Sequence, residues 1–287
     1  MKSGTRALLP LLILVTLIAA TAAPAAAAAP TGAEPAPRTA AATITLRNYF
    51  LLRDREGGEA KLVPVLRVVP TTVGSATAAM RELVKGPNAI EAAASPKIIS
   101  VIPASTTLRN VRIAAGTATV NLSRPFGSRG TEYSMRGRLA QVVYTLTQFT
   151  TVTRVRFEIE GVPLTTFGGL SLANPMTRTT FREAYLPSIF VDQPAWGAAA
   201  GKPVRVTGLA NVFEAAFRIA ILDGRRRVLV DRMAMATCGT GCWGLIDVTI
   251  AYSVGSAQMG TLRVYSISAM DGSRQAIRDY PVWLTPR

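Results

Sequence analysis

The chain has 287 residues, enough for two domains that each bury a core of their own. It contains no histidine, which excludes Ser-His-Asp and Cys-His catalysis and removes the commonest transition-metal ligand. The formal net charge is +15, and +13 remains once Lys2 and Arg6 are subtracted, so anionic lipids, wall polymers or acidic proteins are the expected partners and nucleic acid is not.

Residues 1–22 have the pattern of an export signal. Lys2 and Arg6 precede an apolar stretch at residues 7–20, and small residues follow in an A-x-A arrangement. No cysteine lies near this cleavage region, so a lipid-anchored lipoprotein is not expected. The alternative is an uncleaved N-terminal anchor, because the apolar run can be extended toward the roughly 20 residues that span a bilayer. Either way, we expect an exported protein that is extracellular or associated with the cell envelope.

Residues 23–42 are mostly alanine, proline and threonine, a composition that builds no core and predicts a linker. Strands are expected at residues 43–52 and 61–70, on either side of the turn-rich sequence RDREGGE. A short helix follows, with Ser75 as its N-cap and Gly86 at its end. Two further strands flank Ala115 and Gly116. This mixed pattern predicts a first domain over residues 43–180.

Residues 131–150 carry one apolar stripe with helical spacing, which predicts a helix lying on a sheet. The stripe consists of Leu139, Val142, Val143 and Leu146.

The strand that follows places Glu158 and Glu160 on one face, and a pair of carboxylates is the machinery of a glycosidase. Arg154 and Arg156 continue the same row, so a charged, solvent-facing surface is the favoured interpretation. No residue is assigned a catalytic role.

Residues 187–287 contain seven short strands separated by turns, which is typical of an immunoglobulin-like sandwich. Asp223 and Gly224 form a hairpin turn. Beside the turn, Arg225, Arg226 and Arg227 are either a basic patch for an anionic polymer or an exposed charged hairpin.

The stretch from Gly208 to Gly224 reads as one strand closed by a turn. In that strand Phe213 and Phe217 would face the core, and Glu214 and Arg218 would share the less apolar face. Arg205, on the preceding strand, is the expected partner of Glu214. A structural role is favoured for Glu214 over a catalytic one, because a catalytic acid needs a partner group and a cleft.

Cys238 and Cys242 are four residues apart across a Gly-Thr-Gly turn. In an oxidising compartment they are expected to form a disulfide, and a free or redox-active pair is the alternative. A zinc site would lack its remaining ligands. The sequence therefore predicts no metal and no cofactor.

The sequences AMRELVKGP, ATVNLSRPF and QVVYTLTQFTTVTRVRFEIEG resemble, in order and spacing, the GerMN domain of bacterial sporulation and germination proteins. The sequences from VRVTGLANVFEAAFRIAILDG to YPVWL resemble the immunoglobulin-like domain of bacterial spore germination. One departure is Asn121, where the family usually has aspartate; asparagine serves equally well as the cap of a turn.

The resemblance implies an α+β domain, with a mixed sheet and packed helices, followed by an all-β sandwich. It also implies an exported, non-enzymatic envelope protein that binds a protein partner or assembles with itself through the first domain. One alternative is a protein that binds a wall polymer or a membrane surface through its basic residues. A wall-glycan hydrolase is a less favoured alternative.

Overall fold

The computed structural model describes residues 42–53 and 58–286. The expected export signal and nearly all of the expected linker lie outside the described residues. None of the helices in the described ranges is both long enough and apolar enough to cross a membrane.

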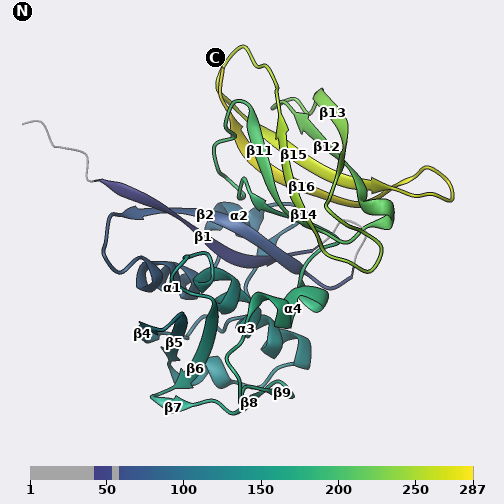
Figure 1. The fold of residues 1–287 in the computed structure, drawn as a ribbon. Coiled ribbons are helices and arrows are strands. Elements are labelled where there is room, and N and C mark those ends of the chain that lie inside the picture. The colour runs from purple at the N-terminus through teal and green to yellow at the C-terminus, as the bar shows by residue number, and fades with distance from the viewer. Residues whose placement is uncertain (1–41, 54–57, 287) are drawn as a thin grey trace, which may run out of the picture. The chain divides into compact units, whose positions relative to one another are not determined.

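The elements fall into two groups along the chain (Figure 1). The first group is β1 (Thr43–Leu52), β2 (Lys61–Pro70), α1 (Ser75–Lys85), α2 (Ala89–Ala93), β3 (Ile98–Ile99), β4 (Leu108–Ala114), β5 (Thr117–Leu122), η1 (Arg124–Gly127), α3 (Glu132–Leu146), β6 (Arg154–Ile159), β7 (Val162–Pro163), β8 (Thr166–Phe167), β9 (Leu170–Ser171) and α4 (Arg178–Tyr185). The second group is β10 (Ile189–Gln193), β11 (Val204–Ala210), η2 (Phe213–Ala215), β12 (Ala216–Leu222), β13 (Val228–Met235), β14 (Gly244–Ile250), β15 (Gln258–Ile267) and β16 (Arg274–Leu284).

The first group forms an α+β domain in three layers. One sheet has the order β2-β1-β3 and another has the order β4-β5-β6-β7. Helices α1 and α3 pack on each other; α1 contacts β1 and β4, and α3 contacts β1 and β6, so the helices lie between the two sheets (Figure 1). The crossover through α3 makes β5 and β6 parallel, whereas β1 and β2 are antiparallel.

Helix α3 is buried from Gly137 to its end, because it has a sheet on each side. The predicted apolar stripe is confirmed as core. A second, polar stripe was not predicted: Gln141 and Thr145, with Gln148 just beyond the helix, bind the backbone of β1. Thr145 Oγ1 accepts from the N–H of Tyr49 at 3.1 Å, and the Gln148 amide bonds both the N–H and the carbonyl of Arg47. Along part of β1, these side chains make the backbone hydrogen bonds that a neighbouring strand would otherwise make.

The second group forms a sandwich of the predicted kind. One sheet has the order β10-β11-β14 and the other β13-β12-β15-β16, and every pairing in them is antiparallel. Inward-facing side chains such as Val206, Ile219 and Val264 are fully buried between the sheets. One continuous hydrophobic cluster includes these residues together with those of the α+β domain.

Two local predictions in the α+β domain had different outcomes. Helix α1 ends at Gly86 as predicted, but its N-cap is Gly74 and Ser75 is already helical. The Ser75 hydroxyl donates to the Thr72 carbonyl instead of capping the helix. The prediction of Ser75 as the N-cap was therefore wrong.

The prediction of one strand through residue 214 was also wrong. Strand β11 ends at Ala210, and the chain crosses to the other sheet through the short helix η2 before β12 begins. Glu214 lies in this crossing with a φ of 52°, so it shares no strand face with Arg218. Arg205 pairs with Asp247 at 2.7 Å and not with Glu214. Because the side chain of Phe213 also leaves the sheet, it is 62% exposed.

Candidate functional site

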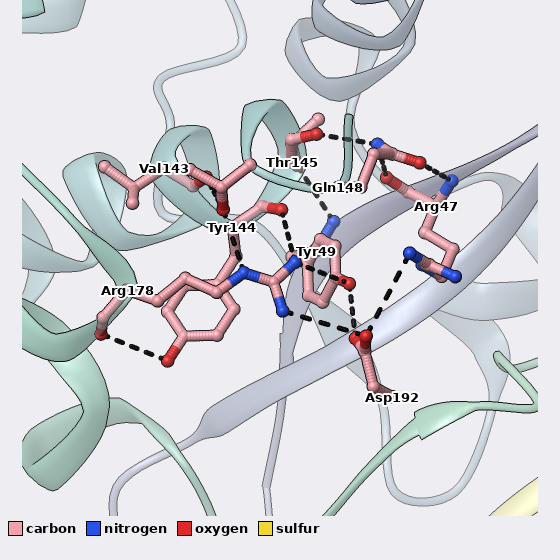
Figure 2. Close-up of polar contacts among 9 residues, drawn as sticks. Arg47, Tyr49, Val143, Tyr144, Thr145, Gln148, Arg178 and Asp192 are labelled. Carbon is pink, nitrogen blue, oxygen red and sulfur yellow. Dashed lines mark hydrogen bonds and ion pairs between the residues drawn. The ribbon is translucent and has the colours of Figure 1, made fainter. Parts of the chain in front are cut away.

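A partly buried polar cluster links the α+β domain to the first strand of the sandwich (Figure 2). We call it the junction cluster and define it by Arg47, Tyr49, Tyr144, Arg178 and Asp192. Strand β1 supplies the first two residues, α3 supplies Tyr144, α4 supplies Arg178, and β10 supplies Asp192. The cluster therefore draws four elements together.

Arg178 is the centre of the junction cluster. Its guanidinium donates to Thr147 Oγ1 at 2.8 Å, to Tyr49 Oη at 3.1 Å and to the Tyr144 carbonyl at 3.2 Å. It also lies over the rings of Tyr144 and Tyr49, at 4.7 and 5.2 Å from their centroids. Such stacking on aromatic faces is characteristic of arginine, whose planar cation is weakly hydrated.

Asp192 is the carboxylate through which the sandwich contacts Arg178. The Tyr49 hydroxyl donates to Asp192 Oδ1, and Arg178 Nη1 lies 3.7 Å from Asp192 Oδ2. Arg47 Nη2 is 4.0 Å from the same oxygen. The carboxylate thus faces two guanidiniums and a hydroxyl, all from the α+β domain.

The tyrosines of the cluster are held in the neutral form. Burial raises the pKa of Tyr49 to about 12, with Asp192 adding to the rise against the opposing effect of Arg178. Burial likewise raises the pKa of Tyr144. A general base works best with a pKa near the operating pH, so neither hydroxyl is suited to proton abstraction. The chemistry of the cluster is that of a clamp between elements.

Other contacts extend the junction on both sides. The indole N–H of Trp243 donates to Glu183 Oε1 at 2.6 Å, and Arg182 lies over the same indole. Farther along, Arg278 donates to the carbonyls of Lys61 and Leu62 at 3.1 and 3.0 Å. Two open hollows, of about 690 and 400 Å³, adjoin the junction cluster, one lined in part by Arg47 and the other by Arg178.

The carboxylates considered for glycosidic chemistry are held by arginines of β4. Glu158 pairs with Arg112 at 2.7 Å, and Glu160 accepts two bonds from Arg109 at 2.9 and 3.0 Å. Hydrogen bonds from Arg109 and from the N–H of Arg124 lower the pKa of Glu160. A general acid needs a raised pKa, so this geometry favours the charged surface over the catalytic alternative.

The candidate basic patch is partly neutralised by local acids. Arg226 pairs with Asp279 at 3.3 Å, and Arg227 with Asp223 at 2.8 Å. All three arginines, Arg225 included, are exposed. A polymer-binding role for the patch stays a prediction.

Cys238 and Cys242 are joined in a disulfide. The loop that they close packs on the crossing between β11 and β12: the N–H of Thr240 donates to the Val212 carbonyl at 2.9 Å, and Thr240 Oγ1 accepts from the N–H of Glu214 at 3.1 Å. The loop leads directly into Trp243, so it supports one of the contacts between the domains.

Two family models match this chain. The family described as sporulation and spore germination matches residues 47–165, and the immunoglobulin-like domain of bacterial spore germination matches residues 188–273. The chain carries a GerMN domain followed by a germination-type immunoglobulin-like domain, as the sequence predicted.

Solved structures that resemble this chain include two of the sporulation protein GerM from Bacillus subtilis. Its first GerMN domain is 25% identical and covers 47% of this chain and 98% of its own length, with a TM-score of 0.38. Its tandem GerMN domains are 17% identical and cover 85% of this chain and 61% of their own length, with a TM-score of 0.39. A putative lipoprotein from Clostridium perfringens is 17% identical, covers 48% and 89%, and has a TM-score of 0.34. No curated protein matches.

Helix α4 lies between the two matched regions, yet it supplies Arg178, Arg182 and Glu183 to the junction. The connection between the GerMN domain and the immunoglobulin-like domain is therefore a structural element and not a spacer. The departure at Asn121 has a local explanation, because its Oδ1 accepts from the N–H of Gly161 at 3.0 Å and caps the turn after β6.

Sequence reasoning missed the junction cluster. The sequence features that could have indicated it are weak. Tyr49 and Tyr144 stand in apolar runs, and Asp192 is a lone carboxylate at the end of an apolar strand.

Proposed function

We propose that this GerMN protein is an exported, envelope-associated interaction module without enzymatic activity. The observation that carries the proposal is the junction cluster, in which Arg178 and Asp192 are used to hold two domains together. A protein that fixes two domains in one arrangement presents its outer surfaces as a single rigid platform for a partner.

The test is co-purification of the native protein from the envelope fraction after mild cross-linking. We expect one partner, or a second copy of the chain, to be recovered in constant proportion with the wild-type protein. An Asp192→Ala variant should lose part of that recovery, whereas Asp247→Ala, which removes an exposed carboxylate of the same sandwich, should not. Recovery of the chain alone from the envelope, or its absence from that fraction, would contradict the proposal.

A second candidate is binding of an anionic wall polymer. The observation that favours it is the outer face of β6, where Arg154 and Arg156 are exposed next to Thr117 and Thr119 of the adjacent strand. Sedimentation with purified walls over a salt series tests this role, because electrostatic binding weakens as salt screens the charges. Binding that is indifferent to salt would rule out the electrostatic version.

A further inference from the structure

Strand β13 is an open sheet edge with an apolar surface. It lies at the end of the order β13-β12-β15-β16, and within the described ranges no strand pairs with its outer side. Its exposed apolar side chains are Val228, Leu229, Met233 and Met235, with exposed fractions from 37 to 62%. Proteins usually blunt such edges, because unpaired N–H and C=O groups pair readily with another strand.

The opposite edge of the same sheet is covered. Along β16 the N–H of Gly197 donates to the Pro281 carbonyl at 2.8 Å, and the N–H of Ala200 donates to the Trp283 carbonyl at 2.9 Å. The edge of β2 is covered in the same way by Trp196, whose N–H donates to the Pro64 carbonyl. The fold thus protects two edges with its own backbone and leaves β13 exposed.

The register shows which groups of β13 are available. The N–H of Ala236 donates to the Ala215 carbonyl at 3.0 Å, in line with the pairing of Met235 with Ala216. Because the bonding direction alternates along an antiparallel strand, Met235 and Met233 direct their N–H and C=O groups away from β12. The Asp231 carbonyl also points outward and accepts from the Arg218 side chain at 3.3 Å.

The charges around this edge favour an acidic partner. Arg232 lies on the strand and is exposed, and Arg225 is exposed on the hairpin that precedes it. The nearby carboxylates are already bound: Asp231 by Arg218 at 2.9 Å and Asp223 by Arg227 at 2.8 Å. An incoming carboxylate would therefore meet arginines whose positive charge the local acids leave uncompensated.

The same charges disfavour a second copy of the chain. A two-fold antiparallel pairing of β13 with itself that overlaps along its length is centred on Asp231 or on Arg232. The first register places Asp231 opposite Asp231, and the second places Arg232 opposite Arg232. Like charges directly opposite each other destabilise a strand pair.

We propose that β13 binds an extended, acidic segment of a partner protein by strand addition. The inference rests on the proposed interaction role and specifies the chemistry of the partner: apolar residues at alternate positions, with carboxylates between them. The outward backbone groups of Met233 and Met235 supply the hydrogen bonds, and their flexible side chains adapt to the apolar residues.

The probe is a blocked, fluorescent peptide that alternates valine with threonine, aspartate and glutamate, and binding is followed by fluorescence anisotropy. Met233→Pro removes an outward N–H while the ladder to β12 stays intact, so it should weaken binding at least about tenfold. Met233→Ala keeps that N–H and should weaken binding much less. Arg232→Glu should reverse the preference between the acidic peptide and a version with lysine in place of its acids.

Three results would overturn the inference: no binding of the acidic peptide at millimolar concentration, equal binding to the Met233→Pro protein, or equal binding of the lysine peptide. If circular dichroism shows that Met233→Pro does not fold, the test rests on whether Arg232→Glu reverses the preference between the acidic and the lysine peptide. A dimer in sedimentation velocity that Met233→Pro abolishes would assign the edge to a second copy instead. Failure of the peptide while a partner still co-purifies would contradict this edge and leave the proposed function standing.

Discussion

Phe213 and Phe217 lie four residues apart, but only the second is part of the core. The side chain of Phe217 is 2% exposed, whereas that of Phe213 is 62% exposed. Phe217→Ala should lower the free energy of unfolding by about 3 to 5 kcal/mol, because it leaves a cavity. Phe213→Ala should change it far less. Urea denaturation of both variants tests this, and equal losses would contradict the assignment of η2.

Asp192 is the one carboxylate among the five residues of the junction cluster. Asp192→Ala removes the acceptor of the Tyr49 hydroxyl and the counter-ion of Arg178. The free energy of unfolding should therefore fall by about 2 kcal/mol. Asp247→Ala is the matched control, because its ion pair with Arg205 is exposed and should matter little. If the two variants unfold at the same urea concentration, the junction cluster does not stabilise the fold.

Tyr49 makes stability depend on pH in the alkaline range. Its pKa rises from 10.0 to about 12 on folding, because the buried hydroxyl resists ionisation. The folded state therefore binds the proton more tightly, and stability should fall as the pH rises through this window. The urea midpoint should decrease between about pH 10 and pH 12, and less steeply in Tyr49→Phe. An unchanged slope in that variant would assign the effect to other tyrosines.

At the scale of elements, the disulfide loop and η2 support each other. A Cβ on Gly239 would lie 2.2 Å from the Ala215 nitrogen and 2.4 Å from the Val212 carbonyl oxygen. Gly239→Ala should therefore lower the melting temperature clearly, because backbone must move to admit the methyl group. Gly255→Ala is the control, since nothing lies within 4 Å of its Cβ. Equal melting temperatures would show that the loop does not pack on the crossing.

The elements differ in how much of them the sequence could predict. Helix α3 was predictable, because Leu139, Val142, Val143 and Leu146 repeat with the helical period. The break at Glu214 was not, because the surrounding sequence NVFEAA contains no glycine or proline to mark a turn. The positive φ angles of Glu214 and Ala215 occur where the disulfide loop packs, and no local pattern encodes that contact.

At the scale of the molecule, the two domains should unfold together. One hydrophobic cluster runs through both, and the junction cluster adds polar contacts. Scanning calorimetry should give one transition with matching calorimetric and van't Hoff enthalpies. Asp192→Ala combined with Trp243→Ala should broaden or split that transition. Two transitions in the wild-type protein would show that the domains are thermodynamically independent.

The junction also marks the limit of prediction at this scale. The order of the two domains follows from motifs that are local in the sequence. The junction cluster has no motif, because Tyr49 and Asp192 are separated by 143 positions and lie together only in the folded structure. Burial of a polar side chain becomes interpretable only when its partner is known.

The contacts of Arg278 join β16 to β2, so they can form only after both strands have been synthesised. Its guanidinium binds the carbonyls of Lys61 and Leu62, more than 200 positions earlier in the chain. During synthesis from the N-terminus, β2 is made long before β16. The backbone carbonyls of β2 therefore lack their arginine partner until β16 has been made. Contacts of such long range slow folding and leave intermediates exposed. A nascent chain that stops short of β16 would leave the carbonyls of Lys61 and Leu62 without this donor, and would be more open to chaperones and proteases than the folded protein.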